Sequence, residues 1–251
     1  MKHARTLSVT LCIASMPLVT PVPLRAQSSQ ALSPDAVIRI ASAEDSTQHP
    51  VVLLLHGKNG YQAGKDIYEQ YADRLASHGY DVYAVQYYDA ADERVMGSQD
   101  RSARQDLFQR RLRAWVATVR AGIGYVARQP TTDARRIGLL GFSNGALIAI
   151  GTAGLDRRVG AVVELYGAMP AALSGSITRL PPTLILHGDA DQVIGVERAY
   201  ALERFLQQRS IPHAIHVYPG ADHGFDADLA SPDARDAQRR TAAFFDAQLK
   251  R

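Results

Sequence analysis

The chain has 251 residues, of which 46% are hydrophobic and 21% are charged. This suits one globular domain with a full-sized core and leaves little room for a second. Residues 1–26 contain Lys2, Arg5 and Arg25 but no acidic residue, and without these three the 28 basic residues fall to the number of the 25 acidic ones. A remainder near neutrality removes any charge-based reason to expect nucleic acid or an anionic membrane surface as a partner.

The first 26 residues have the pattern of an export signal. The first six carry positive charge, Leu7–Val19 is mostly apolar but too short to cross a bilayer, and Ala26 is a small residue suited to cleavage. A buried N-terminal helix is the alternative, and the three prolines between residues 17 and 23 argue against it. We therefore predict a signal peptide over 1–26, a flexible leader over 27–35, and an exported protein, periplasmic or secreted, without a membrane span.

From residue 36 onward, strand patterns alternate with helix patterns. Strands are predicted at 36–40, 50–55, 81–88, 137–140, 159–166, 183–186 and 215–218, and helices at 66–78, 107–128, 146–150, 196–208 and 232–249. Residues 89–106 are polar and charged and lack periodicity, so we expect a surface insertion there. The alternation predicts one α/β domain over 36–251, with a mainly parallel sheet covered by helices on both faces.

One pentapeptide stands between a predicted strand and a predicted helix, and it reads Gly141-Phe142-Ser143-Asn144-Gly145. A G-x-S-x-G segment in this position forms a tight turn that raises the serine hydroxyl at the positive end of the helix. The two glycines let the strand and the helix approach closely. Taken alone, Ser143 could instead be an ordinary helix N-cap.

An acid and a histidine follow downstream, each just after a predicted strand. The segment His187-Gly188-Asp189-Ala190-Asp191 follows the strand at 183–186, and Ala221-Asp222-His223-Gly224-Phe225 follows the strand at 215–218. Because the carboxyl ends of parallel strands meet at one edge of a sheet, we expect the serine, acid and histidine loops to converge.

These three residue types suit nucleophilic catalysis. A serine hydroxyl needs a base within hydrogen-bond distance, and an imidazole titrates near working pH. We therefore predict Ser143 as the nucleophile and His223 as the general base and then acid. Asp191 would orient the imidazole and stabilise its cation, and Asp189 is a nearby alternative for this acid.

The oxyanion of a tetrahedral intermediate is usually met by two backbone N–H groups, one after the nucleophile and one after an early strand. We assign the first to Asn144. The second belongs to the loop at 56–60, where Lys58 is our first choice and Asn59 the second. The glycines of this loop also fit a plain tight turn, which is compatible with the role.

Several side chains near the same edge are candidates to line a substrate pocket. They are Asn59, Tyr61, Tyr87, Tyr88 and Tyr166. The tyrosines at the strand ends fit core packing equally well. Trp115 has apolar neighbours at helical spacing, so we expect it in the core.

Other polar residues carry weaker signals. Asp222 and Asp226 are expected to be solvated or turn-forming, and His213 and His216 lie on opposite faces of a strand pattern. The only cysteine, Cys12, lies in the predicted signal, and no H-E-x-x-H or phosphate-loop motif occurs. We expect neither a metal nor a cofactor.

The chain resembles the dienelactone hydrolase family of α/β-hydrolases over about residues 36–248. The segments that carry the resemblance are Leu53-Leu54-Leu55-His56-Gly57 and the three quoted above at 141–145, 187–191 and 221–225. The resemblance implies an α/β-hydrolase fold and a small ester or lactone as substrate.

Two departures from the family pattern concern the substrate. Family members that act on dienelactones typically carry a cysteine nucleophile, where this chain has Ser143. They also tend to place an arginine shortly after the histidine to hold a substrate carboxylate, and residues 224–228 offer none. Dienelactone itself is therefore not the expected substrate.

The leading interpretation is a serine hydrolase that cleaves carboxylic esters or lactones through an acyl-enzyme. A peptidase or an acyltransferase on the same scaffold is the second, although peptidases of this scaffold usually carry a large gating domain. A catalytically silent binding protein is the third, and the filled triad positions argue against it. The natural substrate, the acyl-chain preference and the oligomeric state stay open.

Overall fold

The computed structural model describes Met1 and residues 36–43 and 48–250. Apart from Met1, the predicted signal peptide (1–26) and leader (27–35) lie outside the described residues. Residues Ala31–Arg251 form one compact unit, and the description below concerns this unit. No helix in its described part is both long and apolar enough to cross a bilayer.

A seven-stranded sheet forms the centre of the unit, in the order β1-β3-β2-β4-β5-β6-β7. Only β1 runs antiparallel to its neighbour, and the other pairs are parallel. The strands are β1 (Val37–Ala41), β2 (His49–Leu55), β3 (Asp81–Val85), β4 (Thr132–Phe142), β5 (Val159–Leu165), β6 (Thr183–Gly188) and β7 (His213–Tyr218). The mainly parallel sheet predicted from the sequence is confirmed.

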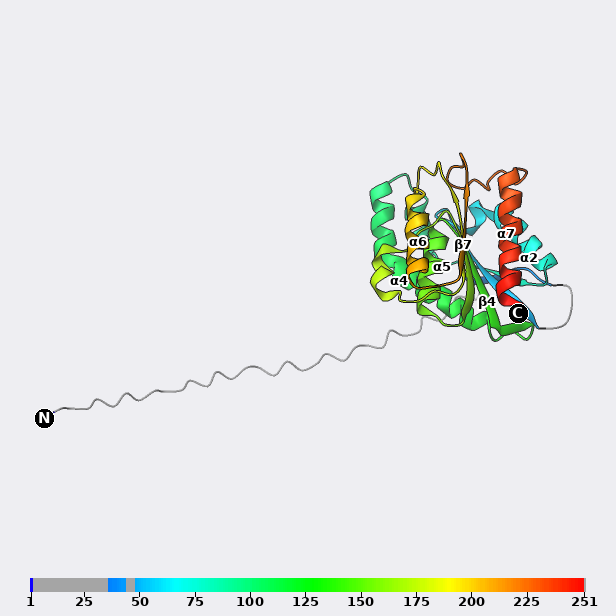
Figure 1. Ribbon diagram of the computed structural model, residues 1–251, viewed down its shortest axis with the longest axis horizontal. Coiled ribbons are helices and arrows are strands. Elements are labelled where there is room, and N and C mark those ends of the chain that lie inside the picture. The colour runs from blue at the N-terminus through cyan, green and yellow to red at the C-terminus, as the bar shows by residue number, and fades with distance from the viewer. Residues whose placement is uncertain (2–35, 44–47, 251) are drawn as a thin grey trace. The chain divides into compact units, whose positions relative to one another are not determined.

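Helices cover both faces of this sheet (Figure 1). They are α1 (Gly60–Ala63), α2 (Lys65–Ser77), α3 (Ala90–Met96), α4 (Arg101–Val126), α5 (Asn144–Leu155), α6 (Glu197–Gln208) and α7 (Pro232–Leu249), with a 3₁₀ helix η2 (Ala171–Ser176). One apolar cluster packs α4, α5 and α6 on one face, and a second packs α2 and α7 on the other. Every residue of β2, β3 and β6 is buried, as expected for parallel strands covered on both faces.

The segment 89–106 differs from its prediction as an insertion without periodicity. Residues Ala90–Met96 form α3, and α4 begins at Arg101. The start of α3 is fixed by a capping box, in which Asp89 and Asp92 each accept a backbone N–H at the other end of the first turn. Capping and ion pairs can hold a helix that has no apolar stripe. A search for apolar periodicity therefore does not predict α3.

The buried carboxylate of Asp92 ties α3 to α4. It accepts a hydrogen bond from Trp115 Nε1 at 2.8 Å and pairs with Arg111 Nε at 3.1 Å. Trp115 is completely buried, so its predicted core position is confirmed. This contact places the first turns of α4 beside the carboxyl ends of the central strands.

Candidate active site

Ser143 lies on the turn between β4 and α5. Its backbone has φ of +52° and ψ of −118°, in a region that few residues other than glycine adopt. Two glycines make the turn possible, because a Cβ on Gly145 would lie 2.1 Å from the Leu55 carbonyl oxygen and one on Gly141 would lie 2.5 Å from the Gly145 carbonyl oxygen. The Ser143 side chain makes no capping hydrogen bond, so its hydroxyl does not serve the helix.

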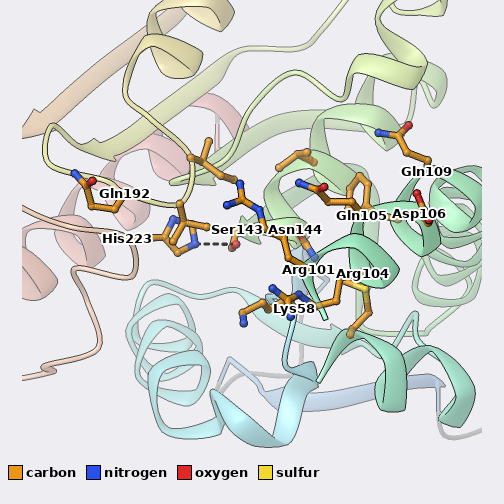
Figure 2. A pocket seen from close by; sticks show the side chains of 15 residues that line it. Lys58, Arg101, Arg104, Gln105, Asp106, Gln109, Ser143, Asn144, Gln192 and His223 are labelled. Carbon is orange, nitrogen blue, oxygen red and sulfur yellow. Dashed lines mark hydrogen bonds between the residues drawn. The ribbon is translucent and has the colours of Figure 1, made fainter. Parts of the chain in front are cut away.

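The Ser143 hydroxyl instead contacts His223 (Figure 2). His223 Nε2 lies 2.9 Å from Ser143 Oγ, and His223 Nδ1 lies 2.8 Å from Asp191 Oδ2. A carboxylate only accepts, so Nδ1 carries the hydrogen and Nε2 is left to accept the hydroxyl proton. The structure therefore brings the three predicted residues together in one hydrogen-bonded chain.

Asp191 is held by several donors. Its side chain is fully buried, and its Oδ1 accepts the backbone N–H groups of Val193 at 2.7 Å and Ile194 at 2.8 Å. Asp189, the alternative acid, is exposed and accepts from the Gly220 backbone N–H at 2.6 Å. Asp191, and not Asp189, is the acid that contacts His223.

A second histidine contacts the same carboxylate, and the sequence analysis missed it. His187 Nε2 lies 3.2 Å from Asp191 Oδ2 and 2.7 Å from the Ile194 carbonyl oxygen. Because a carbonyl oxygen only accepts, the hydrogen of His187 is on Nε2 and is donated to Ile194, with the Asp191 carboxylate close beside it. Burial lowers the pKa of His187, which keeps this imidazole neutral. Its position between a buried strand and the acid loop was a signal available in the sequence.

The other face of His223 packs against an aromatic ring. The Tyr166 ring lies 4.8 Å from the His223 ring, and its hydroxyl donates to Asp226 at 3.0 Å. Tyr71 donates to the other oxygen of Asp226, also at 3.0 Å. Asp226 is completely buried, and burial raises its pKa. Asp226 does lie in a turn, as predicted, but it is not solvated, because Tyr71 and Tyr166 from distant parts of the chain bind its carboxylate.

Asp222 behaves as predicted for a turn residue. Its Oδ1 accepts the backbone N–H groups of Gln192 at 2.9 Å and His223 at 2.7 Å. These two hydrogen bonds lower the pKa of its carboxyl. The bond from Gln192 also links the loop that follows β6, which carries Asp191, to the loop that follows β7, which carries His223.

The loop after β2 lies against the Ser143 turn. The Gly57 backbone N–H donates to the Tyr68 hydroxyl at 2.9 Å, and the Tyr87 hydroxyl donates to the His56 carbonyl oxygen. Burial lowers the pKa of His56 to about 4, and its ring stacks on Tyr87 with 4.1 Å between ring centres. This part of the loop is therefore fixed by the core beneath it.

The two predicted oxyanion donors lie in different elements, and each has a backbone N–H without a partner among the described residues. Asn144 is the first residue of α5, and Lys58 lies in the exposed part of the loop after β2. In the described part of the chain, neither backbone N–H has a hydrogen-bond partner. Both can donate to a bound oxygen.

A carboxylic acid is buried beside this turn. Glu164 of β5 pairs in register with Gly141, and its Oε2 accepts the Gly167 backbone N–H at 2.8 Å. Its Oε1 has no hydrogen-bond partner among the described residues. Complete burial raises the pKa of Glu164 to about 8. The carboxyl is therefore mostly protonated at neutral pH.

A cavity of about 670 Å³ opens over Ser143, Asn144 and His223 (Figure 2). Part of its lining is apolar, with Met96 and Phe108 among the lining side chains. A cavity of this volume accommodates a small organic ligand.

None of the predicted pocket residues is among those that line this cavity. They are Asn59, Tyr61, Tyr87, Tyr88 and Tyr166. The four tyrosines are buried and pack beneath the site. Tyr88, for example, contacts the His56 ring and accepts from the Asn144 side-chain amide at 3.3 Å. One wall of the cavity is formed instead by the end of α3 and the first turns of α4, which include residues 101–106 that the sequence prediction had placed in an insertion.

Metal-binding side chains do not gather in the described part of the chain, where no group of three or more His, Cys, Asp or Glu could hold one ion. His213 and His216 have separate partners. His213 Nδ1 lies 2.7 Å from the Ile211 carbonyl oxygen, and His216 Nε2 lies 3.8 Å from Asp236 Oδ2.

A mainly parallel sheet that carries a serine on a strand-to-helix turn, with an acid and a histidine after later strands, defines the α/β-hydrolase class. The family model of the dienelactone hydrolase family matches residues 37–249. The chain belongs to this family. It is accordingly a hydrolase that acts on ester bonds.

Similar proteins agree with this assignment. A Synechocystis protein provisionally named a carboxymethylenebutenolidase is 27% identical over 221 residues, which cover 81% of this chain and 88% of that protein. A structure provisionally named a dienelactone hydrolase, from Klebsiella pneumoniae, has a TM-score of 0.66 at 22% identity and covers 83% of this chain and 96% of its own. A hyperthermophilic esterase from Pyrobaculum calidifontis has a TM-score of 0.63 at 18% identity, covering 81% and 78%.

Proposed function

We propose that Ser143, His223 and Asp191 form a catalytic triad that cleaves carboxylic esters or lactones through an acyl-enzyme. The observation that carries the proposal is the position of the His223 imidazole, with Nε2 at 2.9 Å from Ser143 Oγ and Nδ1 at 2.8 Å from Asp191 Oδ2. Both distances suit proton transfer from the hydroxyl and orientation of the ring by the carboxylate.

The first chemical step forms the acyl-enzyme. Ser143 Oγ attacks the carbonyl carbon of the ester while its proton passes to His223 Nε2. The imidazolium is stabilised by the Asp191 carboxylate. The negative charge that develops on the carbonyl oxygen is met by the free backbone N–H groups of Asn144 and Lys58, and one such donor is commonly worth about 10²–10³ in rate.

The remaining steps return the enzyme to its starting state. The tetrahedral intermediate breaks its bond to the alcohol, or opens the lactone, and the leaving oxygen takes the proton from His223 Nε2. A water molecule then gives its proton to the same nitrogen and attacks the acyl carbon. The second tetrahedral intermediate expels Ser143 Oγ, which takes the proton back, and the carboxylic acid leaves.

A peptidase on the same scaffold is the alternative with a named structural neighbour. The acylaminoacyl peptidase from Pyrococcus horikoshii has a TM-score of 0.64 at 15% identity, and the match covers 84% of this chain but only 39% of that one. Likeness at this identity concerns the fold alone. Ester substrates are favoured because the family match spans residues 37–249.

Active-site labelling tests the triad. Incubation with a fluorophosphonate, followed by proteolysis and mass spectrometry, should place the adduct on Ser143, because its hydroxyl lies 2.9 Å from an imidazole that can act as its base. Ser143→Ala should abolish labelling, whereas Ser174→Ala, at an exposed serine of η2, should not. A folded wild-type protein that takes no label, or takes it elsewhere, would instead favour the binding-protein interpretation.

We also infer that residues 1–26 direct export. The support is the charged start, the short apolar stretch and the small residue Ala26. The full chain, expressed in a bacterial host with a periplasm, should be recovered from that compartment with Gln27 as its first residue. Recovery from the cytosol with residues 1–26 still attached would contradict the inference.

A further inference from the structure

The imidazole of His223 has polar contacts at its two nitrogens. Nδ1 lies 2.8 Å from Asp191 Oδ2, and Nε2 lies 2.9 Å from Ser143 Oγ (Figure 2). Two such contacts define an axis through the ring, about which the ring can still tilt. Once Ser143 carries the acyl group, its Oγ has no proton to donate, and the contact with Nε2 is lost. A contact on the face of the ring would keep Nε2 in place through that stage of the reaction.

Tyr166 supplies a contact of this kind. Its ring centre lies 4.8 Å from that of His223, with 62° between the two ring planes, and aromatic pairs favour such a tilted arrangement. His223 is among the residues that line the cavity, whereas Tyr166 is buried and is not among them. The tyrosine therefore supports the imidazole from the side of the core.

The backbone of Tyr166 has a conformation that a tyrosine rarely adopts. Its φ is +42°, in the left-handed region, and a residue stays there only where several contacts enforce it. The Tyr166 backbone N–H donates to the Leu186 carbonyl oxygen at 2.8 Å, and the Gly167 N–H donates to the buried Glu164 carboxyl, also at 2.8 Å. Backbone strain of this kind clusters at functional sites, and here it lies directly beside the reacting groups.

The Tyr166 hydroxyl is anchored on the loop that carries His223. It donates to Asp226 Oδ1 at 3.0 Å, and the Tyr71 hydroxyl donates to Asp226 Oδ2 at the same distance. Asp226 follows His223 by three residues. The imidazole and the ring that supports it are therefore fixed to the same short segment of the chain.

Stability alone does not account for a carboxyl at position 226. Asp226 is completely buried. Burial of a carboxyl costs free energy that hydrogen bonds offset only in part, and apolar side chains of the same volume avoid this cost. An anchor for the Tyr166 hydroxyl is a role that an apolar side chain could not fill.

We propose that Tyr166 and Asp226 are positioning residues for His223. The Tyr166 ring keeps the imidazole aligned between Ser143 and Asp191, and Asp226 holds that ring through its hydroxyl. Neither residue is among those that line the cavity, so both act through His223. The proposal rests on the proposed function, because that function makes His223 the base of the reaction.

Removal of the Tyr166 hydroxyl tests the anchor. Tyr166→Phe keeps the ring but releases it from Asp226, so kcat for a nitrophenyl ester should fall at least about tenfold while KM changes less than about threefold. Tyr218→Phe is the matched control, because Tyr218 is buried in the same apolar cluster but donates its hydroxyl to Asp236. Its kcat should stay within about twofold of the wild type. Equal losses of kcat in the two variants would overturn the proposal.

Substitutions of Asp226 distinguish an anchor from a charge. Asp226→Ala removes both acceptors of the tyrosine hydroxyls and should lower kcat at least about tenfold. Asp226→Asn retains polar atoms that can bind both hydroxyls but carries no charge, so it should recover most of that loss. An Asn variant as impaired as the Ala variant, with both folded by circular dichroism, would mean that the charge acts on His223 directly and would overturn the positioning role.

Proton NMR of the free enzyme reports on His223 without any turnover. The Nδ1 hydrogen that His223 donates to Asp191 should give a low-field resonance in the wild type and in Tyr218→Phe. Tyr166→Leu removes the supporting ring, so this resonance should broaden or disappear. An unchanged resonance in folded Tyr166→Leu would overturn this proposal alone. A wild type that shows the resonance but neither hydrolyses an ester nor takes the fluorophosphonate label would overturn the proposed catalytic function alone.

Discussion

Two regions of the molecule meet at the cavity, and they are built differently. The strand-end loops (residues 141–145, 187–194 and 219–226) carry Ser143, Asp191 and His223, and their polar groups are bound to one another. The helical wall (residues 89–109) is anchored from below by Asp92 but presents unpaired side chains to the cavity. The reacting side chains are therefore held mainly by hydrogen bonds to one another and to backbone groups, whereas the wall presents side chains such as Met96, Gln105 and Phe108 to the cavity.

The largest effect on activity is expected from removing a charge inside the strand-end loops. Asp191→Asn keeps the size of the side chain but removes the carboxylate that orients His223, so kcat/KM for a nitrophenyl ester should fall by about 10³–10⁴. Asp189→Asn is the matched control, and its effect should stay within about threefold, because the exposed Asp189 carboxylate accepts from the Gly220 backbone and does not contact His223 in the described structure. Steady-state kinetics on both variants measures kcat/KM. A larger loss of kcat/KM in the Asp189 variant would identify Asp189, and not Asp191, as the acid of the triad.

A second test concerns the pH dependence of stability at Glu164, which lies on β5 beside the strand-end loop that carries Ser143. Burial raises the pKa of Glu164 from its ordinary 4.5 to about 8, so the folded state holds this proton more tightly than the unfolded state. The resulting stabilisation is fully present below about pH 4.5 and is lost as the pH rises through about 8.

Glu164→Gln should remove that dependence. The amide oxygen can still accept the Gly167 backbone N–H, and the side chain no longer has a proton to lose. The wild type should lose a few kcal/mol of unfolding free energy between about pH 5 and 8.5 that the variant retains. Urea unfolding of both proteins at the two pH values measures this, and parallel losses in the two proteins would contradict it.

The smallest effect is expected from a substitution in the helical wall, at the buried carboxylate of Asp92. Asp92→Asn keeps an acceptor for Trp115 but loses the charge that faces Arg111, which is 38% exposed and therefore partly screened. The free energy of unfolding should fall by about 1–2 kcal/mol. The value of kcat/KM for a nitrophenyl ester should also fall, because α3 and α4, which line the cavity, lose part of their anchor.

Asp156→Asn is the control for this change. Asp156 is another buried carboxylate, paired with Arg120 and Arg158 and absent from the cavity lining. Its substitution should cost a similar amount of stability by thermal unfolding and leave kcat/KM unchanged. Equal changes of kcat/KM in both variants would show that the wall has no special part in shaping the cavity.

The sequence predicts the strand-end loops better than it predicts the helical wall. The sheet and the segments at 141–145, 187–191 and 221–225 could be predicted because each places a special residue directly after a strand. The local sequence pattern cannot show that Asp226 accepts a hydrogen bond from Tyr71, which lies 155 residues away in the chain. It also cannot show that the His187 ring lies against the Asp191 carboxylate. These contacts are fixed by the tertiary fold.

The pocket predictions failed for a related reason. Tyr87 and Tyr88 follow β3 at the correct edge of the sheet, but their rings point into the cluster around His56 and Trp115. An aromatic residue at a strand end is equally compatible with the core and with a cavity. The path of α3 and of residues 101–106, which precede the apolar stripe of α4, decides which side chains form that wall of the cavity.

The anchoring of the helical wall has a consequence for how such a protein diversifies. Asp92, Arg111 and Trp115 hold the two helices without using any of the wall's cavity-facing polar side chains, which include Gln105 and Gln109. Randomising those positions should therefore redirect the enzyme to new molecules with little loss of folding yield. Laboratory evolution of a library confined to one helical surface is a practical use of this separation.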